Sequence, residues 1–127
     1  MTRSLERIML VEDDPDIQAV GQLALEAVGG FTVQLCSSGQ EALEHVPRFA
    51  PDLILLDVMM PGMDGPTTFE ALRTKLADAT PPVIFITAKV QAHEIAHYKQ
   101  LGALDVISKP FDPMTLSETI CGIWMRG

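Results

Sequence analysis

Five short runs of apolar and β-branched residues decide what this chain can fold into. Each run is four or five residues long, which is too short for a stable helix, and each ends at polar or turn-forming residues. Three of the runs contain four consecutive apolar residues, namely Ile8–Val11, Leu53–Leu56 and Val83–Ile86. Uninterrupted apolar strands are typical of a parallel sheet that is covered on both faces. The predicted strands cover residues 8–11, 32–36, 53–56, 83–87 and 105–108.

The segments between the strands carry apolar residues at helical spacing. The first predicted helix begins at Asp14-Pro15, because aspartate caps a helix and proline suits its first turn. It ends at Gly29-Gly30, since glycine commonly follows the last helical turn. Its expected inner face consists of Ile17, Val20, Gly21, Ala24, Leu25 and Val28.

The other four helices follow the same logic. A capping box at residues 38–41 opens the second helix, and Asp112-Pro113 caps the fifth. We expect the second helix to stop at Pro47, because proline lacks the backbone N–H that a helix interior needs. The remaining expectations are an end at residue 75 or 76 for the third helix, residues 91–101 for the fourth, and a buried stripe of Leu116, Ile120, Ile123 and Trp124 for the fifth.

Strands that alternate strictly with helices define the fold class. Such a chain forms an α/β fold, a doubly wound five-stranded parallel sheet with its five helices on both faces. Right-handed crossovers leave few topologies, and the strand order 2-1-3-4-5 is the common one for five strands. The length of 127 residues suits one domain, which we expect to span residues 1–127.

Composition excludes several classes of function. A net charge of −8 argues against nucleic acid binding, which needs a basic surface. A hydrophobic fraction of 47% is typical of a globular chain, and no stretch has the pattern of a membrane span or a signal peptide. The two cysteines, Cys36 and Cys121, are too few for a disulfide framework, and we expect both to be small buried residues. We therefore expect a cytoplasmic protein that contacts neither nucleic acid nor a membrane directly.

Polar side chains stand at the ends of four of the strands. The expected topology places these four strand ends at the same edge of the sheet. Glu12 and Asp13 follow the first strand, Asp57 the third and Lys109 the fifth, while Thr87 ends the fourth. In the expected strand order these ends lie close together. Three carboxylates repel one another unless a cation lies among them, and oxygen ligands suit a hard divalent ion such as Mg²⁺. With a lysine charge and a hydroxyl donor beside them, they are the parts that phosphoryl transfer to a carboxylate needs.

The motifs at this edge resemble those of one family. They are Glu12-Asp13, Leu53–Asp57, Met60–Gly65, Thr87-Ala88 and Lys109–Phe111. In order and spacing they are similar to the receiver domain of bacterial two-component response regulators, over essentially the whole chain. The resemblance implies a flavodoxin-like receiver fold and a signalling domain that catalyses only its own phosphorylation and dephosphorylation. No output domain is expected within residues 1–127.

The resemblance also implies a path for the phosphoryl group. Asp57 would accept it from the phosphohistidine of a histidine kinase or phosphotransfer protein. Lys109 would hold a phosphoryl oxygen, and its peptide bond to Pro110 would be cis. Thr87 would move to bond the phosphoryl group and shift the surface formed by the fourth helix, fifth strand and fifth helix. A downstream protein target, or an output domain outside this chain, would read that surface.

A magnesium site follows from the same resemblance. Asp13, Asp57 and the backbone carbonyl of Met59 would bind Mg²⁺ directly, and Glu12 would act through water. No cysteine or histidine belongs to the group, which is why a transition-metal site is not expected.

Three positions depart from common family patterns or modulate the reaction. The family often has tyrosine or phenylalanine three residues before the lysine, where this chain has Val106, so an aromatic rotamer switch cannot operate there. By resemblance, the positions two residues after Asp57 and two after Thr87 govern loss of the phosphoryl group. Here they are Met59 and Lys89, neither of which orients an attacking water well, so we expect a long-lived phosphoryl group.

Other function classes fit the residues less well. A haloacid-dehalogenase-like phosphatase needs a second aspartate where Met59 stands, and the acids after the first strand would repel the phosphate of a flavin mononucleotide. No phosphate-binding GxxxxGK[ST] loop is present. The alternative that stays open is a receiver-like interaction module that works without phosphorylation. Such a module would be expected to have lost Asp13, Asp57 or Lys109, and this chain retains all three.

Overall fold

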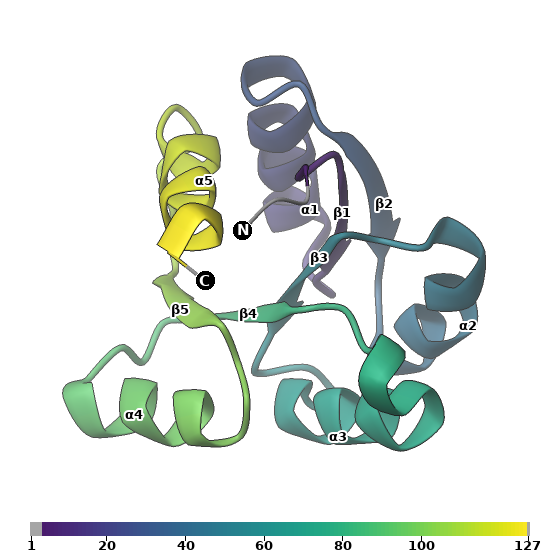
Figure 1. Cartoon of the computed structure of the whole chain (residues 1–127). Helices are drawn as coiled ribbons and strands as arrows, with labels where there is room; N and C mark the ends of the chain where they lie inside the picture. Colours follow the sequence, from purple (N-terminus) through teal and green to yellow (C-terminus); the bar gives the residue numbers. More distant parts are fainter. Residues whose placement is uncertain (1–3, 127) are drawn as a thin grey trace.

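The computed structural model describes residues 4–126 of the chain, and these form a parallel sheet of five strands. The strand order is β2-β1-β3-β4-β5, as the sequence predicts, and every neighbouring pair is parallel (Figure 1). The strands are β1 (Arg7–Val11), β2 (Thr32–Cys36), β3 (Leu53–Asp57), β4 (Val83–Thr87) and β5 (Asp105–Ser108).

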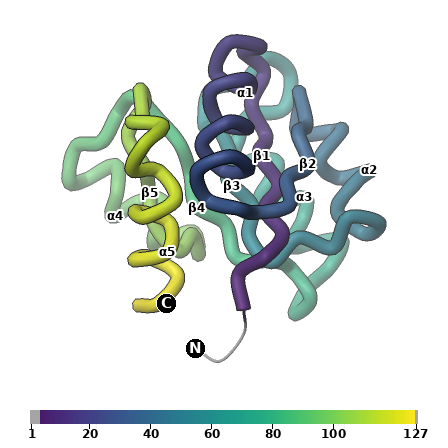
Figure 2. Tube along the Cα trace, turned by 90° about the horizontal axis from the view of Figure 1, so that it is seen from above, coloured from purple at the N-terminus to yellow at the C-terminus, as the bar shows by residue number. Residues whose placement is uncertain are grey.

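Helices cover both faces of the sheet, so the chain has the expected three-layered α/β architecture. In Figure 1, α1 and α5 lie on one side of the sheet and α3 and α4 on the other, and Figure 2 shows α1 and α5 next to each other. Within residues 4–126, no helix combines the length and the apolar character that a membrane-spanning segment needs. The helices are α1 (Pro15–Gln22), α2 (Gly39–Phe49), α3 (Gly65–Leu76), α4 (Ala92–Gln100) and α5 (Leu116–Arg126), with a π-helical segment η1 (Leu23–Val28) after α1 and a 3₁₀ turn η2 (Ala77–Ala79) after α3.

The hydrophobic core is divided into two parts by the sheet, because successive side chains of a strand point to opposite faces. Ile8 and Leu10 of β1 pack with η1 and α5, whereas Met9 and Val11 pack with α2 and α3. β3 and β4 are buried along their whole length. Strands buried in this way form a rigid platform, and their carboxyl ends carry the polar residues singled out above.

The predicted inner face of the first helix is wrong at two positions. Val20 and Val28 are 39% and 44% exposed. α1 approaches the sheet through Gly21, where a Cβ atom would lie 2.5 Å from Leu10 Cδ2, and this leaves Val20 to one side. Val28 lies in the π-helical segment, whose wider turns rotate the following residues away from the 3.6-residue period.

The second helix continues past the proline at which we expected it to stop. α2 includes Pro47 and ends at Phe49. Pro47 has no N–H to donate to the Leu43 carbonyl one turn earlier. Lys75 of α3 supplies a donor instead, since its Nζ lies 3.0 Å from that carbonyl oxygen. The helix therefore extends for one more half-turn because a neighbouring helix satisfies the acceptor that proline leaves open.

Two expectations about the C-terminal helix also need correction. Cys36 is buried as expected, but Cys121 is exposed, because the stripe that faces the sheet includes Ile120 and the next residue points away from it. α5 begins at Leu116 rather than directly after Asp112. Asp112 still caps the turn that precedes it, since its carboxylate accepts a hydrogen bond from the Met114 backbone N–H at 2.8 Å.

Candidate functional site

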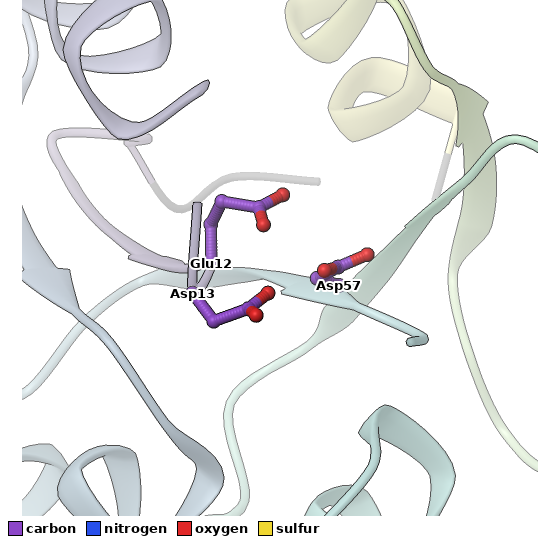
Figure 3. Close-up of side chains that lie close together, drawn as sticks. All are labelled: Glu12, Asp13 and Asp57. Atoms are coloured by element: carbon purple, nitrogen blue, oxygen red, sulfur yellow. The ribbon is translucent and has the colours of Figure 1, made fainter. Parts of the chain in front are cut away.

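Three acidic side chains meet at the carboxyl ends of β1 and β3. The two strands are neighbours, with Val11 opposite Leu56, so the residues that follow them lie side by side. One carboxylate oxygen each from Glu12, Asp13 and Asp57 lies within 4.8 Å of the others, and Figure 3 shows the three side chains close together. Glu12 and Asp57 are buried, at 0% and 1% exposed, whereas Asp13 is exposed. The structure thus brings together the acidic group that the sequence predicts.

Lys109 places a positive charge between the two buried carboxylates. Its Nζ lies 3.0 Å from Glu12 Oε1 and 3.2 Å from Asp57 Oδ1. The lysine follows β5, where its backbone N–H donates to the Thr87 carbonyl at 2.9 Å, and the Lys109–Pro110 peptide bond is cis, as predicted. Burial lowers the pKa of Lys109, but the hydrogen bonds to the two carboxylates outweigh burial and raise the pKa above its usual value. Lys109 therefore stays charged.

The pKa of the Glu12 carboxyl is raised well above its usual value. Burial raises the pKa of its carboxyl from 4.5 to about 7, and the charge of Asp57 adds to the effect. Hydrogen bonds from the Asp14 backbone N–H and from Lys109 favour the charged form, but they offset only part of the cost of burial. Without a further cation, Glu12 binds a proton readily near neutral pH.

Asp57 has one occupied and one open carboxylate oxygen. Oδ1 accepts from Lys109, whereas Oδ2 is the only buried side-chain oxygen or nitrogen in residues 4–126 without a hydrogen-bond partner. Buried polar atoms without a partner are rare, so the open oxygen of Asp57 is available to a ligand. The donor set, made of carboxylate oxygens without histidine or cysteine, fits a hard divalent cation.

Gly65 at the start of α3 explains how the loop after Asp57 folds back so closely. A Cβ atom at this position would lie 2.5 Å from the Asp57 backbone oxygen, and the Gly65 N–H donates to the Val58 carbonyl at 2.9 Å. Asp64 caps the same helix by accepting from the Thr67 N–H at 2.9 Å. The Asp-Gly pair therefore fixes the far end of the loop against the end of β3.

The other predicted residues surround the acidic group. Thr87 ends β4, is 2% exposed, and accepts a hydrogen bond from the Lys89 backbone N–H at 3.1 Å. Met59 is 67% exposed in the loop after β3, and Lys89 is exposed in the loop after β4. Val106 lies one strand away, half-buried opposite Phe85 of β4.

Two contacts near the site involve partners that the sequence does not indicate. Tyr98 of α4 packs on the ring of Phe85, with ring centroids 5.0 Å apart, so the aromatic contact beside Val106 comes from α4. Gln18 of α1 donates from its side-chain amide to the Glu12 carbonyl. Helical spacing predicts that Tyr98 lies on the inner face of the fourth helix, but it does not identify Phe85 as the partner. A glutamine in a helix gives no signal of a partner six residues away.

An apolar groove of about 390 Å³ adjoins the site. It lies between α1 and the segment after β5, and the exposed Val20 is one of its lining residues. Its lining residues are Asp16, Ile17, Val20, Ala88, Lys109, Pro110 and Phe111.

Comparison with known proteins agrees with this geometry. Residues 8–121 match the family described as the response regulator receiver domain. The chain belongs to this family. It is a receiver domain of two-component response regulators, a signalling domain.

Similar proteins extend the match. The DNA-binding response regulator MtrA of Mycolicibacterium smegmatis is 36% identical over 111 residues, which cover 87% of this chain and 47% of MtrA. The transcriptional regulatory protein CseB of Streptomyces coelicolor is 36% identical over 119 residues, which cover 94% of this chain and 49% of CseB. The chemotaxis protein CheY4 of Vibrio cholerae has a similar structure, with a TM-score of 0.84, 27% identity, and coverage of 94% of this chain and 99% of CheY4. The receiver domain thus spans about half the length of the curated relatives it matches.

Proposed function

We propose that Asp57 is the phosphoacceptor of this receiver domain. The observation that carries the proposal is the state of its carboxylate, which is buried, held by Lys109 through Oδ1 and unpartnered at Oδ2. A fixed carboxylate with one free oxygen is suited to nucleophilic attack on phosphorus. In the reaction, a bond forms between an Asp57 oxygen and phosphorus, and the bond from phosphorus to the donor's imidazole nitrogen breaks. The electron pair of the broken bond stays on that nitrogen.

Lys109 stabilises the charge that moves during this transfer. Its Nζ already contacts Asp57 and Glu12, and we propose that it holds a phosphoryl oxygen once the group is on Asp57. Fixed positive charge beside a transferring phosphoryl group is a large part of catalysis of this reaction. Because Lys109 follows β5 and is tied to Thr87 through its backbone, it is aligned before the donor arrives.

The acidic group fits Mg²⁺, and we propose the same ligands that the sequence suggests. Asp13, Asp57 and the Met59 carbonyl would bind the ion directly, with Glu12 acting through water. Bound Mg²⁺ neutralises charge on the carboxylates and on phosphoryl oxygens. Glu12 must lose its proton for the group to carry its full negative charge. Its raised pKa therefore couples cation binding to proton release near pH 7.

We also propose that Thr87 reports phosphorylation to the outer surface. Thr87 lies at the end of β4, two residues from Phe85, on whose ring Tyr98 of α4 packs. Val106 carries no ring and is stiff at χ1, so the response should appear in α4 and in the loop after Thr87. A histidine kinase or phosphotransfer protein is the proposed donor. A downstream protein, or an output domain in a longer chain, is the proposed receiver of the signal.

The phosphoryl group is proposed to be long-lived because of two side chains. Met59 has no useful hydrogen-bonding group and can cover the site, and Lys89 is a poor base at neutral pH. Replacing both by polar and acidic residues, as Met59→Asn/Lys89→Glu, should speed loss of the group about tenfold after donor removal. Equal or slower loss in the double variant would show that these side chains do not control hydrolysis.

Acetyl phosphate with Mg²⁺ and intact mass spectrometry test the central proposal. The wild-type chain should gain one phosphoryl group, EDTA should suppress the gain, and Asp57→Asn should not gain it. Asp78→Asn, in the exposed turn η2, is the matched control and should react like the wild type. A wild-type chain that gains nothing would instead favour the module that works without phosphorylation.

A further inference from the structure

A side chain of α1 holds the loop that carries the acidic residues. The Glu12 backbone N–H donates to the carbonyl of Cys36 at 2.9 Å, and Cys36 and Val11 are the last pair of β2 and β1. At the same residue, the Glu12 carbonyl accepts from Gln18 Nε2. The same nitrogen lies 3.1 Å from Ser37 Oγ. Gln18 therefore ties the end of β1 to the segment after β2, where the strands themselves no longer pair.

Asp13 depends on this tie more than the other two acids do. Glu12 and Asp57 are buried and hydrogen-bonded to Lys109. Asp13 is exposed, and no donor in residues 4–126 is hydrogen-bonded to its carboxylate. The part of Asp13 that the surrounding structure holds in place is therefore its backbone. That backbone begins at the peptide bond whose carbonyl Gln18 holds.

We propose that Gln18 is a positioning residue for the divalent cation site, acting by fixing the peptide bond between Glu12 and Asp13. The inference rests on the proposed function, because it requires that the acidic group bind a cation. An amide suits the role, since it donates hydrogen bonds without adding a charge. A lysine or arginine at position 18 would supply a donor but would also repel the incoming cation.

Gln18→Met is the informative substitution. Methionine keeps the unbranched length and the helix propensity of glutamine but donates no hydrogen bond. Loss of one neutral hydrogen bond predicts a Kd for Mg²⁺ that rises about fivefold, measured by isothermal titration of the metal-free chain with magnesium chloride. Gln22→Met is the matched control, because Gln22 lies one turn later on α1 and no hydrogen bond of its side chain occurs in residues 4–126. It should leave the Kd unchanged.

A kinetic readout separates positioning from a merely structural role. In phosphorylation by acetyl phosphate, Gln18→Met should raise the Mg²⁺ concentration needed for half the maximal rate by the same factor as the Kd. The rate at saturating Mg²⁺ should stay at the wild-type value, because Asp57 and Lys109 are untouched. Ser37→Ala, which removes only the second contact of the amide, should produce a smaller change in the same direction.

The outcomes distinguish this inference from the function on which it rests. A wild-type chain that binds no Mg²⁺ would overturn both. A wild-type chain that binds Mg²⁺ while Gln18→Met binds it equally well would overturn the role of Gln18 alone. A Gln18→Met chain with a normal Mg²⁺ midpoint and a reduced saturating rate would also overturn it, since general damage to the site would then explain the loss.

Discussion

Replacing Glu12 by glutamine isolates the electrostatic strain in the acidic group. Glu12 is 0% exposed, and burial raises its pKa from 4.5 to about 7. At about 1.4 kcal/mol per pKa unit, this corresponds to about 3 kcal/mol of folding free energy. A raised pKa means that the folded state prefers neutral Glu12. The stability contributed by that preference is fully present below pH 4.5 and is lost as the pH rises through 7.

Glutamine cannot ionise, so the Glu12→Gln variant does not lose this stability as the pH rises. In EDTA, the stability of the variant relative to the wild type should therefore increase by about 3 kcal/mol between pH 4 and pH 8. If glutamine bonds to Lys109 differently from glutamate, the unfolding free energy of the variant changes by the same amount at pH 4 and at pH 8. This change therefore cancels when the two pH values are compared. Urea unfolding at each pH, followed by the fluorescence of buried Trp124, measures the effect.

The matched control is Glu70→Gln, which changes an exposed glutamate on α3. Its stability relative to the wild type should be the same at both pH values. Saturating Mg²⁺ should also reduce the gain of Glu12→Gln at pH 8, because a cation compensates the charge of Glu12. A difference between Glu12→Gln and the wild type that stays constant from pH 4 to pH 8 would refute the reasoning.

Three further predictions address the surrounding structure. Lys75→Met should lower the free energy of unfolding in urea by about 1 kcal/mol. Adding Pro47→Ala should restore most of that loss, because the helix then supplies its own backbone donor to the Leu43 carbonyl. Full stability in Lys75→Met alone would contradict the contact. Gly65→Ala should destabilise by about 2 kcal/mol and slow phosphorylation, since the new methyl group crowds the Asp57 backbone, and an unchanged melting curve would contradict this. With a beryllofluoride mimic, amide exchange should change in α4 and in the loop after Thr87; a change confined to β5 would contradict the proposed route.

Much of the fold is encoded in short-range patterns, which is why the sequence predicts it. Leu53–Leu56 is too short for a stable helix and is therefore predicted to be a buried strand. The alternation of strands with helices leaves few strand orders, of which 2-1-3-4-5 is the common one. Once that order is accepted, Glu12 and Asp57 must end neighbouring strands. The acidic group follows from topology as much as from any motif.

The parts that could not be predicted depend on contacts between distant side chains. Nothing local to Pro47 indicates that Lys75, 32 residues after Leu43, would supply the missing donor. The π-helical segment, likewise, is accompanied by a hydrogen bond from Ser117 to the Ala24 carbonyl, 93 residues away. Such contacts change the ends and faces of helices by a few residues but leave the sheet intact. The periodicity of apolar residues in the sequence carries no information about such contacts.

The most direct test of the central claim is to locate the phosphoryl group. After reaction with acetyl phosphate and Mg²⁺, borohydride reduces an aspartyl phosphate to homoserine, and peptide mass spectrometry then identifies the position. We expect homoserine at position 57, with Asp13 unmodified and no product when Mg²⁺ is chelated. Homoserine at position 13, or a phosphorylated chain with unmodified Asp57, would contradict it.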